Sequence, residues 1–312
     1  MKLPFEASFT GAYQFLFRRI LSVIGTLWLP MLVNMGLCAG IVYLVVPHGW
    51  WHGQFPVMDS EHPDPAAALA MMQPILAAMF PVIAVCLIFG AMMKIGLLQL
   101  ALGQKERCFV YFSLGADVWR LIAAWILSGL IMVLIEILVV LSVVLLVTVA
   151  KPLLGGWGIL LAVLCGIAGV CFLIYVAVRL IFFLPAVATA EHKIGLERSW
   201  ELGRGNFWRI VGLCLAVIIP VVIVSSILQQ IVIATPAGAE YARWTHDYYT
   251  HIFQNTKPDF AMVFGAQFRA MWPLIPWFMV IGVVQGIVTS GLMAGATAKA
   301  YLAVSGADEV KS

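Results

Sequence analysis

Charged side chains are scarce in this chain, and their scarcity excludes most soluble folds. Only 11% of the 312 residues are Asp, Glu, Lys or Arg, whereas 63% are hydrophobic and the mean hydropathy is +1.02. Soluble domains carry about 25% charged residues, because a surface in water needs them. The net charge of +3 is small, and no run of Lys and Arg provides the footprint that nucleic acid requires. We therefore expect a membrane protein that does not bind nucleic acid.

Cysteine pairs and catalytic motifs are also missing. The six cysteines form no CxxC, and none lies in a segment that we expect on the outer side of the membrane, so no disulfide framework is predicted. Five fall in apolar runs, where cysteine acts as a small hydrophobic residue, and Cys108 lies in a basic loop. The chain has no G-x-S-x-G, no H-E-x-x-H and no Gly-rich phosphate loop. The sequence thus predicts no catalytic residues, no metal site and no cofactor.

Six stretches are long and apolar enough to cross a membrane. A helix needs about 20 mostly apolar residues to span about 30 Å of hydrocarbon. Backbone groups have no water partners in lipid, so we expect each continuous apolar run to be a helix and not a strand of a barrel. The predicted spans run approximately from Ile20 to Val46, Ala67 to Met93, Leu121 to Ala150, Ile159 to Leu184, Ile210 to Ala234 and Met271 to Thr297. The predicted fold is an all-α polytopic bundle with six spans.

The distribution of Lys and Arg predicts the orientation of this bundle, because basic residues concentrate on the cytoplasmic side. Thirteen fall on one side of the spans and four on the other, with Arg179 left inside a span. The thirteen are Lys2, Arg18, Arg19, Lys94, Lys105, Arg107, Arg120, Lys193, Arg198, Arg204, Arg209, Lys299 and Lys311, and the four are Lys151, Arg243, Lys257 and Arg269. We expect the bundle to lie in a bacterial-type inner membrane, with both termini in the cytoplasm. The first apolar run exceeds the roughly 15 residues of a signal h-region, so we expect an uncleaved first span.

The cytoplasmic approach to each odd-numbered span carries a related pattern: GAYQFLFRRIL, GADVWRLIAAW and GRGNFWRIVGL. In the last two, a candidate N-cap is followed by a tryptophan and an arginine, which suit the headgroup level and lipid phosphate. These residues are Asp117, Trp119 and Arg120 before the third span, and Asn206, Trp208 and Arg209 before the fifth. The pattern suggests three repeated hairpins, over residues 1–104, 105–193 and 194–312. The alternative is convergence, since any helix that enters lipid from the cytoplasm favours these residue types.

The stretch from Arg179 to Arg209 reads RLIFFLPAVATAEHKIGLERSWELGRGNFWR and is the most informative in the chain. Pro185 is expected to loosen the inner end of the fourth span. A short amphipathic helix should follow, with Ser199 and Gly203 on its apolar face, and should lie on the cytoplasmic membrane surface. Gly203 and Gly205 then end that helix, so that the chain turns into the fifth span.

This stretch resembles the membrane domain attached to some bacterial glycerophosphodiester phosphodiesterases, and related six-span inner-membrane proteins that consist of that domain alone. The positions that match are Arg179, Pro185, Ser199, Trp200, Gly205, Phe207 and Trp208. The resemblance implies a membrane domain over the whole chain, although the specific matches are concentrated in about thirty residues. The phosphodiesterase barrel has no counterpart in this sequence, so the resemblance does not imply phosphodiesterase activity, and we expect no enzyme.

Three polar residues fall at similar depth within the predicted spans: Asn34, Glu136 and Gln285. A carboxylate near mid-membrane is costly and is a functional candidate by default. One interpretation is a polar core between helices, with Glu136 neutral and hydrogen-bonded. The other is a proton or cation path around Glu136.

Other polar and aromatic residues have both a structural and a functional interpretation. Arg179 either anchors the fourth span or contacts lipid phosphate, and Trp200, Arg209, Trp119 and Arg120 are candidates for the same anchoring or headgroup role. Five histidines lie in the two larger outer loops, but their spacing predicts no metal site: His48, His52, His62, His246 and His251. An aromatic stripe after the fifth span predicts a helix that packs on the bundle or on the membrane: Tyr241, Trp244, Tyr248 and Ile252.

From the sequence we therefore expect a non-catalytic inner-membrane module in envelope or lipid maintenance, whose interfacial helices hold lipid headgroups. The alternative is a small transporter or channel with a polar path around Glu136. Membrane lipids are the expected partners. The sequence predicts neither protein partners nor an oligomeric state.

Overall fold

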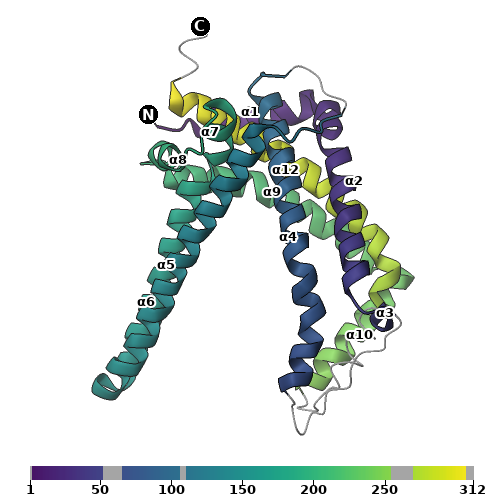
Figure 1. Ribbon diagram of the computed structural model, residues 1–312, viewed down its shortest axis with the longest axis vertical. Coiled ribbons are helices and arrows are strands. Elements are labelled where there is room, and N and C mark those ends of the chain that lie inside the picture. Colours follow the sequence, from purple (N-terminus) through teal and green to yellow (C-terminus); the bar gives the residue numbers. More distant parts are fainter. Residues whose placement is uncertain (1, 52–64, 106–109, 254–269, 307–312) are drawn as a thin grey trace. The chain divides into compact units, whose positions relative to one another are not determined.

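A computed structural model describes residues 2–51, 65–105, 110–253 and 270–306. Every regular element in these ranges is helical, which confirms the all-α prediction. Six helices are long and apolar enough to cross a membrane, so the protein is an integral membrane protein of the multi-pass type. The elements are α1 (Phe5–Arg18), α2 (Ile20–Val45), α3 (His48–Trp51), α4 (Pro65–Ala101), α5 (Ala116–Leu154), α6 (Gly156–Ile181), α7 (Leu184–Ala190), α8 (Leu196–Leu202), α9 (Phe207–Ile233), α10 (Pro236–Phe253), η1 (Trp272–Leu274) and α12 (Ile275–Ser305) (Figure 1).

Several helices continue beyond the apolar runs that predicted them. α4 extends to Ala101, α5 begins at Ala116 and α12 extends to Ser305, each several residues beyond the predicted span. A helix ends where its backbone hydrogen bonds find other partners, not where the sequence stops being apolar. α1, a separate helix before the first span, was not predicted.

The described chain divides into two compact units, each of which we describe by itself. Unit 1 comprises residues 1–26, 91–217 and 290–312, and unit 2 comprises residues 27–90 and 218–289. This grouping reflects contacts in space, whereas the three predicted hairpins concern repetition along the chain. The repeat therefore stays a prediction.

Unit 1 contains the hairpin of α5 and α6, which run side by side (Figure 1). Gly155 connects them with a φ of 57°, a conformation that side chains disfavour. Gly169 of α6 lies so close to Val139 of α5 that a Cβ at this position would collide with it. α7 contacts α5, and α8 contacts α6 and α7, so the two short helices cover one end of this hairpin.

Unit 2 contains a small apolar core formed by Val232, Leu274 and Ile281. Tyr241 of α10 packs against this core and stacks on Trp244, with ring centroids 6.0 Å apart. The predicted aromatic stripe therefore lies on a helix and faces the protein at Tyr241; the side chains of Tyr248 and Ile252 are outside the described residues. Thr235 precedes α10, and its hydroxyl accepts a hydrogen bond from the Gly238 amide at 3.3 Å, which caps the helix.

Candidate functional site

Arg179 is buried near the end of α6, with only 6% of its surface exposed. Its Nη1 donates to the Tyr175 hydroxyl at 2.7 Å, and its Nη2 donates to the Trp200 carbonyl at 2.8 Å. The guanidinium also lies over the Trp200 ring, 3.7 Å from the ring centroid. A planar guanidinium makes this pair of hydrogen bonds and this ring contact better than an ammonium group does. Arg179 therefore connects α6 to α8 through contacts within the protein.

Local sequence explains why α8 returns to α6 at this point. α6 ends at Ile181, and Pro185 stands in the first turn of α7, where its missing amide hydrogen is not needed. His192 and Gly195, in the turn between α7 and α8, have φ values of 55° and 57°. Only glycine adopts such an angle freely, and a Cβ at Gly195 would also collide with Val187. Pro185 thus starts a new helix, and the two left-handed residues reverse the chain.

The buried face of α8 completes the attachment to α6. The Ser199 hydroxyl donates to the Leu180 carbonyl at 2.7 Å, in a fully buried position. Gly203 lies against the backbone of Arg179, and a Cβ on it would come within 3.3 Å of the Arg179 Cα. The predicted apolar face of this helix, with Ser199 and Gly203, is confirmed. We name Tyr175, Arg179, Ser199, Trp200 and Gly203 the arginine junction.

The outer face of α8 carries charges that neutralise one another. Arg198 bonds to Glu191 and to Glu201, both at 3.3 Å, and the Tyr301 hydroxyl of α12 donates to Glu191 at 3.0 Å. Desolvation of Arg198 works to lower its pKa, but hydrogen bonds to the two carboxylates outweigh this effect and raise the pKa. Arg198, the cation of α8, is thereby paired with two carboxylates.

Asn206 and Arg209 hold the amino-terminal segment of the chain. The Leu3 amide donates to Asn206 Oδ1 at 2.9 Å, and Arg209 Nη1 donates to the Leu3 carbonyl at 2.9 Å. Leu3 itself is fully buried. Leu3 and Asn206 are 203 positions apart in the sequence, so these bonds connect distant segments of unit 1. A predicted headgroup anchor, Arg209, thus has one donor occupied by backbone.

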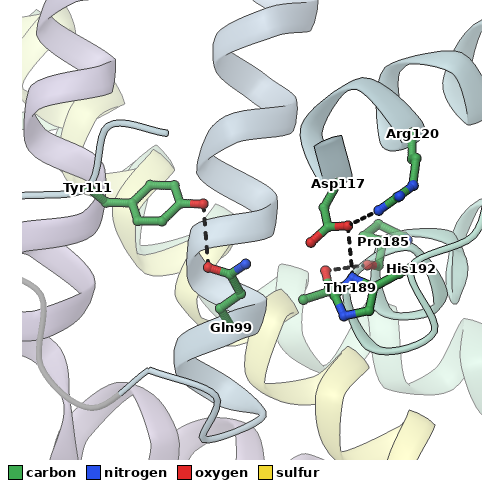
Figure 2. A network of polar contacts seen from close by, with 7 residues as sticks. All are labelled: Gln99, Tyr111, Asp117, Arg120, Pro185, Thr189 and His192. Atoms are coloured by element: carbon green, nitrogen blue, oxygen red, sulfur yellow. Dashed lines mark hydrogen bonds and ion pairs between the residues drawn. The ribbon is translucent and has the colours of Figure 1, made fainter. Parts of the chain in front are cut away.

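The prediction of Asp117 as the N-cap of the third span is wrong. α5 already begins at Ala116, and the Val118 amide bonds to the Gly115 carbonyl at 3.0 Å. Figure 2 shows the Asp117 carboxylate between Arg120, at 2.6 Å, and His192 Nδ1, at 2.9 Å. Its carboxylate therefore bonds to side chains of α5 and of the turn after α7. Arg120 is thereby paired, whereas the Trp119 side chain beside it is 53% exposed.

The polar residues within the spans belong to different units. Glu136 lies in unit 1 and is exposed on the surface of α5, whereas Asn34 and Gln285 lie in unit 2 and are half-buried. Asn34 Oδ1 accepts a hydrogen bond from the Cys38 thiol at 3.7 Å, and Cys38 Sγ lies 3.8 Å from Cys86 Sγ. Whether Glu136 shares a polar core with Asn34 and Gln285 stays a prediction.

α1 presents two different faces. Ser8, Gly11, Ala12 and Leu16 are buried on one of them. The other carries an aromatic ladder, Phe5, Phe9, Tyr13 and Phe17, whose successive ring centroids lie 6.3, 4.8 and 6.3 Å apart. Phe5 and Phe17, its two ends, are 38% and 68% exposed. Sequence reasoning found the start of the first span but not this ladder, whose spacing of four residues is the pattern that predicts one helix face.

Among the described residues, no group of three or more His, Cys, Asp and Glu side chains is arranged to hold a metal ion. His52 and His62, two of the outer histidines, lie outside the described residues, as does the side chain of His251.

Comparison of the chain with protein-family models, with curated proteins and with solved structures found no match. The resemblance to the membrane domain of the phosphodiesterases therefore stays a prediction.

Proposed function

We propose that this membrane protein is a non-catalytic module of a bacterial inner membrane, with both termini in the cytoplasm, that holds phospholipids of the inner leaflet in envelope or lipid maintenance. The observation that carries the proposal is α1. Its aromatic ladder is exposed at both ends, while a neighbouring face of the helix is buried in unit 1. An aromatic ladder with exposed ends, followed by Arg18 and Arg19, suits the boundary between acyl chains and headgroups.

Other features of unit 1 support the same role. Trp119 and Trp208 stand in the first turns of α5 and α9, with 53% and 79% of their surfaces exposed. Tryptophan is enriched at this depth of the bilayer because its ring is apolar and its N–H is polar. The lack of catalytic motifs and the resemblance to a membrane domain support a non-catalytic role.

Lipid retention during purification tests the proposal. The full-length protein is extracted from membranes, and the phospholipids bound per protein are counted by mass spectrometry. We expect the double variant Phe17→Ala, Trp208→Ala to retain fewer phospholipids, because each ring removes a large apolar contact at the interface. Trp277→Ala removes an aromatic side chain of 61% exposure from α12 in unit 2 and serves as the control. Equal retention by both variants and the wild type would contradict the proposal.

A second candidate function is transport along a path that includes Glu136. The observation in its favour is the exposure of this carboxylate on α5, since a charge that faces lipid is costly and one that faces a water-filled path is not. Liposomes that contain a pH-sensitive dye and the protein would test it. A proton leak that Glu136→Gln abolishes would support transport. A leak no faster than that of empty liposomes would exclude a proton path.

A further inference from the structure

A cavity of about 200 Å³ lies in unit 1 where α1, the start of α2, the end of α4 and α12 meet. Its polar lining consists of Gln14, Arg18, Arg19 and Lys299, and we name these four residues and the cavity the basic pocket. All three cationic side chains are exposed, so the pocket is open to the surface. Several water molecules fit such a volume, since each occupies about 30 Å³ in the liquid.

Glycines bring the two ends of the chain together around this pocket. A Cβ on Gly295 of α12 would come within 3.0 Å of the Ala12 Cα on α1, so the two helices touch almost backbone to backbone. A Cβ on Gly11 would likewise meet the Lys299 side chain at 2.8 Å. Lys299 therefore crosses α1 at a position where only glycine leaves it room. Arg19 is held from the other side, because its Nη1 donates to the Leu100 carbonyl at 3.1 Å.

The cations of the basic pocket have no ion pair among the described residues. Among the described residues, no carboxylate oxygen lies within 4.0 Å of a cationic nitrogen of Arg18, Arg19 or Lys299, although Arg120 and Arg198 of the same unit both have such partners. Three cations and an amide side chain around one cavity create a positive potential that favours a small, multiply charged anion. Guanidinium groups bind phosphate through parallel N–H···O bonds, and lysine adds a compact charge.

We propose that the basic pocket binds a phosphate group, with Arg18, Arg19 and Lys299 neutralising its charge and Gln14 donating a hydrogen bond. This inference deepens the proposed function and rests on it where the phosphate belongs to a phospholipid headgroup. Phe15 also lines the pocket, so a bound headgroup would have an apolar side chain beside it. A soluble phosphate ester carries the same group and would use the same donors.

Titration of the full-length protein in nanodiscs distinguishes these two sources. In one arm, phosphatidylglycerol is added to phosphatidylcholine nanodiscs and its enrichment around the protein is measured by native mass spectrometry. In the other arm, inorganic phosphate is added to protein in pure phosphatidylcholine nanodiscs, and the thermal unfolding midpoint is followed. We expect enrichment of phosphatidylglycerol, and about tenfold weaker enrichment for Arg18→Gln, Lys299→Gln, since loss of about 1.4 kcal/mol weakens binding tenfold.

Two further variants keep the result specific. Lys193→Gln, Arg204→Gln removes two exposed charges from unit 1 outside the basic pocket and should enrich phosphatidylglycerol like the wild type. Arg18→Lys, Lys299→Arg keeps both charges and should retain most of the enrichment. This variant tests the pocket if the double glutamine variant fails to fold. Equal loss in the pocket variant and the Lys193, Arg204 control would overturn the pocket.

The remaining outcomes separate the pocket from the proposed function. If the wild type enriches phosphatidylglycerol and the pocket variant does so equally, the pocket is overturned while lipid holding is supported. If phosphate raises the unfolding midpoint only when the pocket is intact and no lipid is enriched, the pocket is upheld as a site for soluble phosphate and the lipid role is overturned. If the wild type shows no lipid enrichment and no phosphate response, both the pocket and the proposed function are overturned.

Discussion

Unit 1 contains one buried arginine, Arg179, and a group of exposed basic side chains in the basic pocket, and the two differ in what they contact. Arg179 in the arginine junction is 6% exposed, and its donors bond to Tyr175 and to the Trp200 carbonyl. The cations of the basic pocket are exposed, and the described residues offer them no carboxylate within 4.0 Å. Arg179 makes contacts within the protein, whereas the exposed cations of the basic pocket are available to a ligand.

The comparison shows that an arginine at the end of a span does not by itself indicate a lipid contact. Arg179, Arg120 and Arg18 all lie near helix ends, and the sequence alone makes Arg179 and Arg120 candidates for the same anchoring role. Only the partners separate them: Arg179 binds a carbonyl and two rings, Arg120 pairs with Asp117, and Arg18 lines a cavity. Availability to lipid is therefore a property of the packing around a cation.

The largest expected effect of breaking the arginine junction is the loss of Arg179. Arg179→Ala leaves the half-buried Trp200 carbonyl and the Tyr175 hydroxyl without their donor and removes the cation from the Trp200 ring. We expect the free energy of unfolding to fall by about 3 kcal/mol, from two hydrogen bonds to a charged group and one cation–π contact. Thermal unfolding in a mild detergent measures this change.

Arg198→Ala is the matched control for this variant. Arg198 is an arginine of α8 whose side chain is 42% exposed, and its ion pairs should contribute less than about 1 kcal/mol. Arg179→Lys should fall between the two, because an ammonium group keeps the charge but not the flat stacking surface. If Arg179→Ala and Arg198→Ala unfold at the same temperature, the junction does not hold α6 to α8.

A smaller effect is expected where Asn206 holds the amino-terminal segment. Asn206→Ala deprives the buried Leu3 amide of its acceptor, which should cost about 1 to 2 kcal/mol. The loss should be local, so that hydrogen exchange of the peptide around Leu3 becomes faster while exchange in α5 and α6 stays unchanged. Asn206→Asp keeps an acceptor oxygen and should protect Leu3 better than Asn206→Ala. Unchanged exchange in Asn206→Ala would show that Leu3 is held by other contacts.

Elements that depend on local sequence were largely predictable. Six apolar runs predicted six long helices, and the spacing of Ser199 and Gly203 predicted the buried face of α8. In each case the deciding interactions, backbone hydrogen bonds in lipid and one apolar face, involve residues a few positions apart.

Contacts between distant residues were not predictable in the same way. Periodicity identifies a face of a helix, but it does not identify the helix that covers that face. The bond from Leu3 to Asn206 joins residues 203 positions apart, and packing of Gly295 on α1 brings Lys299 and Arg18 to one cavity. Asp117 failed as an N-cap for the same reason, because one of its partners, His192, is 75 positions away. The basic residues were all visible in the sequence, but their partners were not.

The smallest effect on the free energy of unfolding is expected for the basic pocket. This prediction separates the pocket most clearly from the arginine junction. Arg18→Gln, Lys299→Gln removes two exposed cations that have no carboxylate partner among the described residues, so we expect the free energy of unfolding without phosphate or anionic lipid to change by less than about 0.5 kcal/mol. Thermal unfolding in a neutral detergent measures this. In phosphatidylglycerol the wild type alone should gain stability, because a ligand stabilises the folded state that binds it. A loss as large as that of Arg179→Ala, already in neutral detergent, would place these cations among the structural contacts of unit 1.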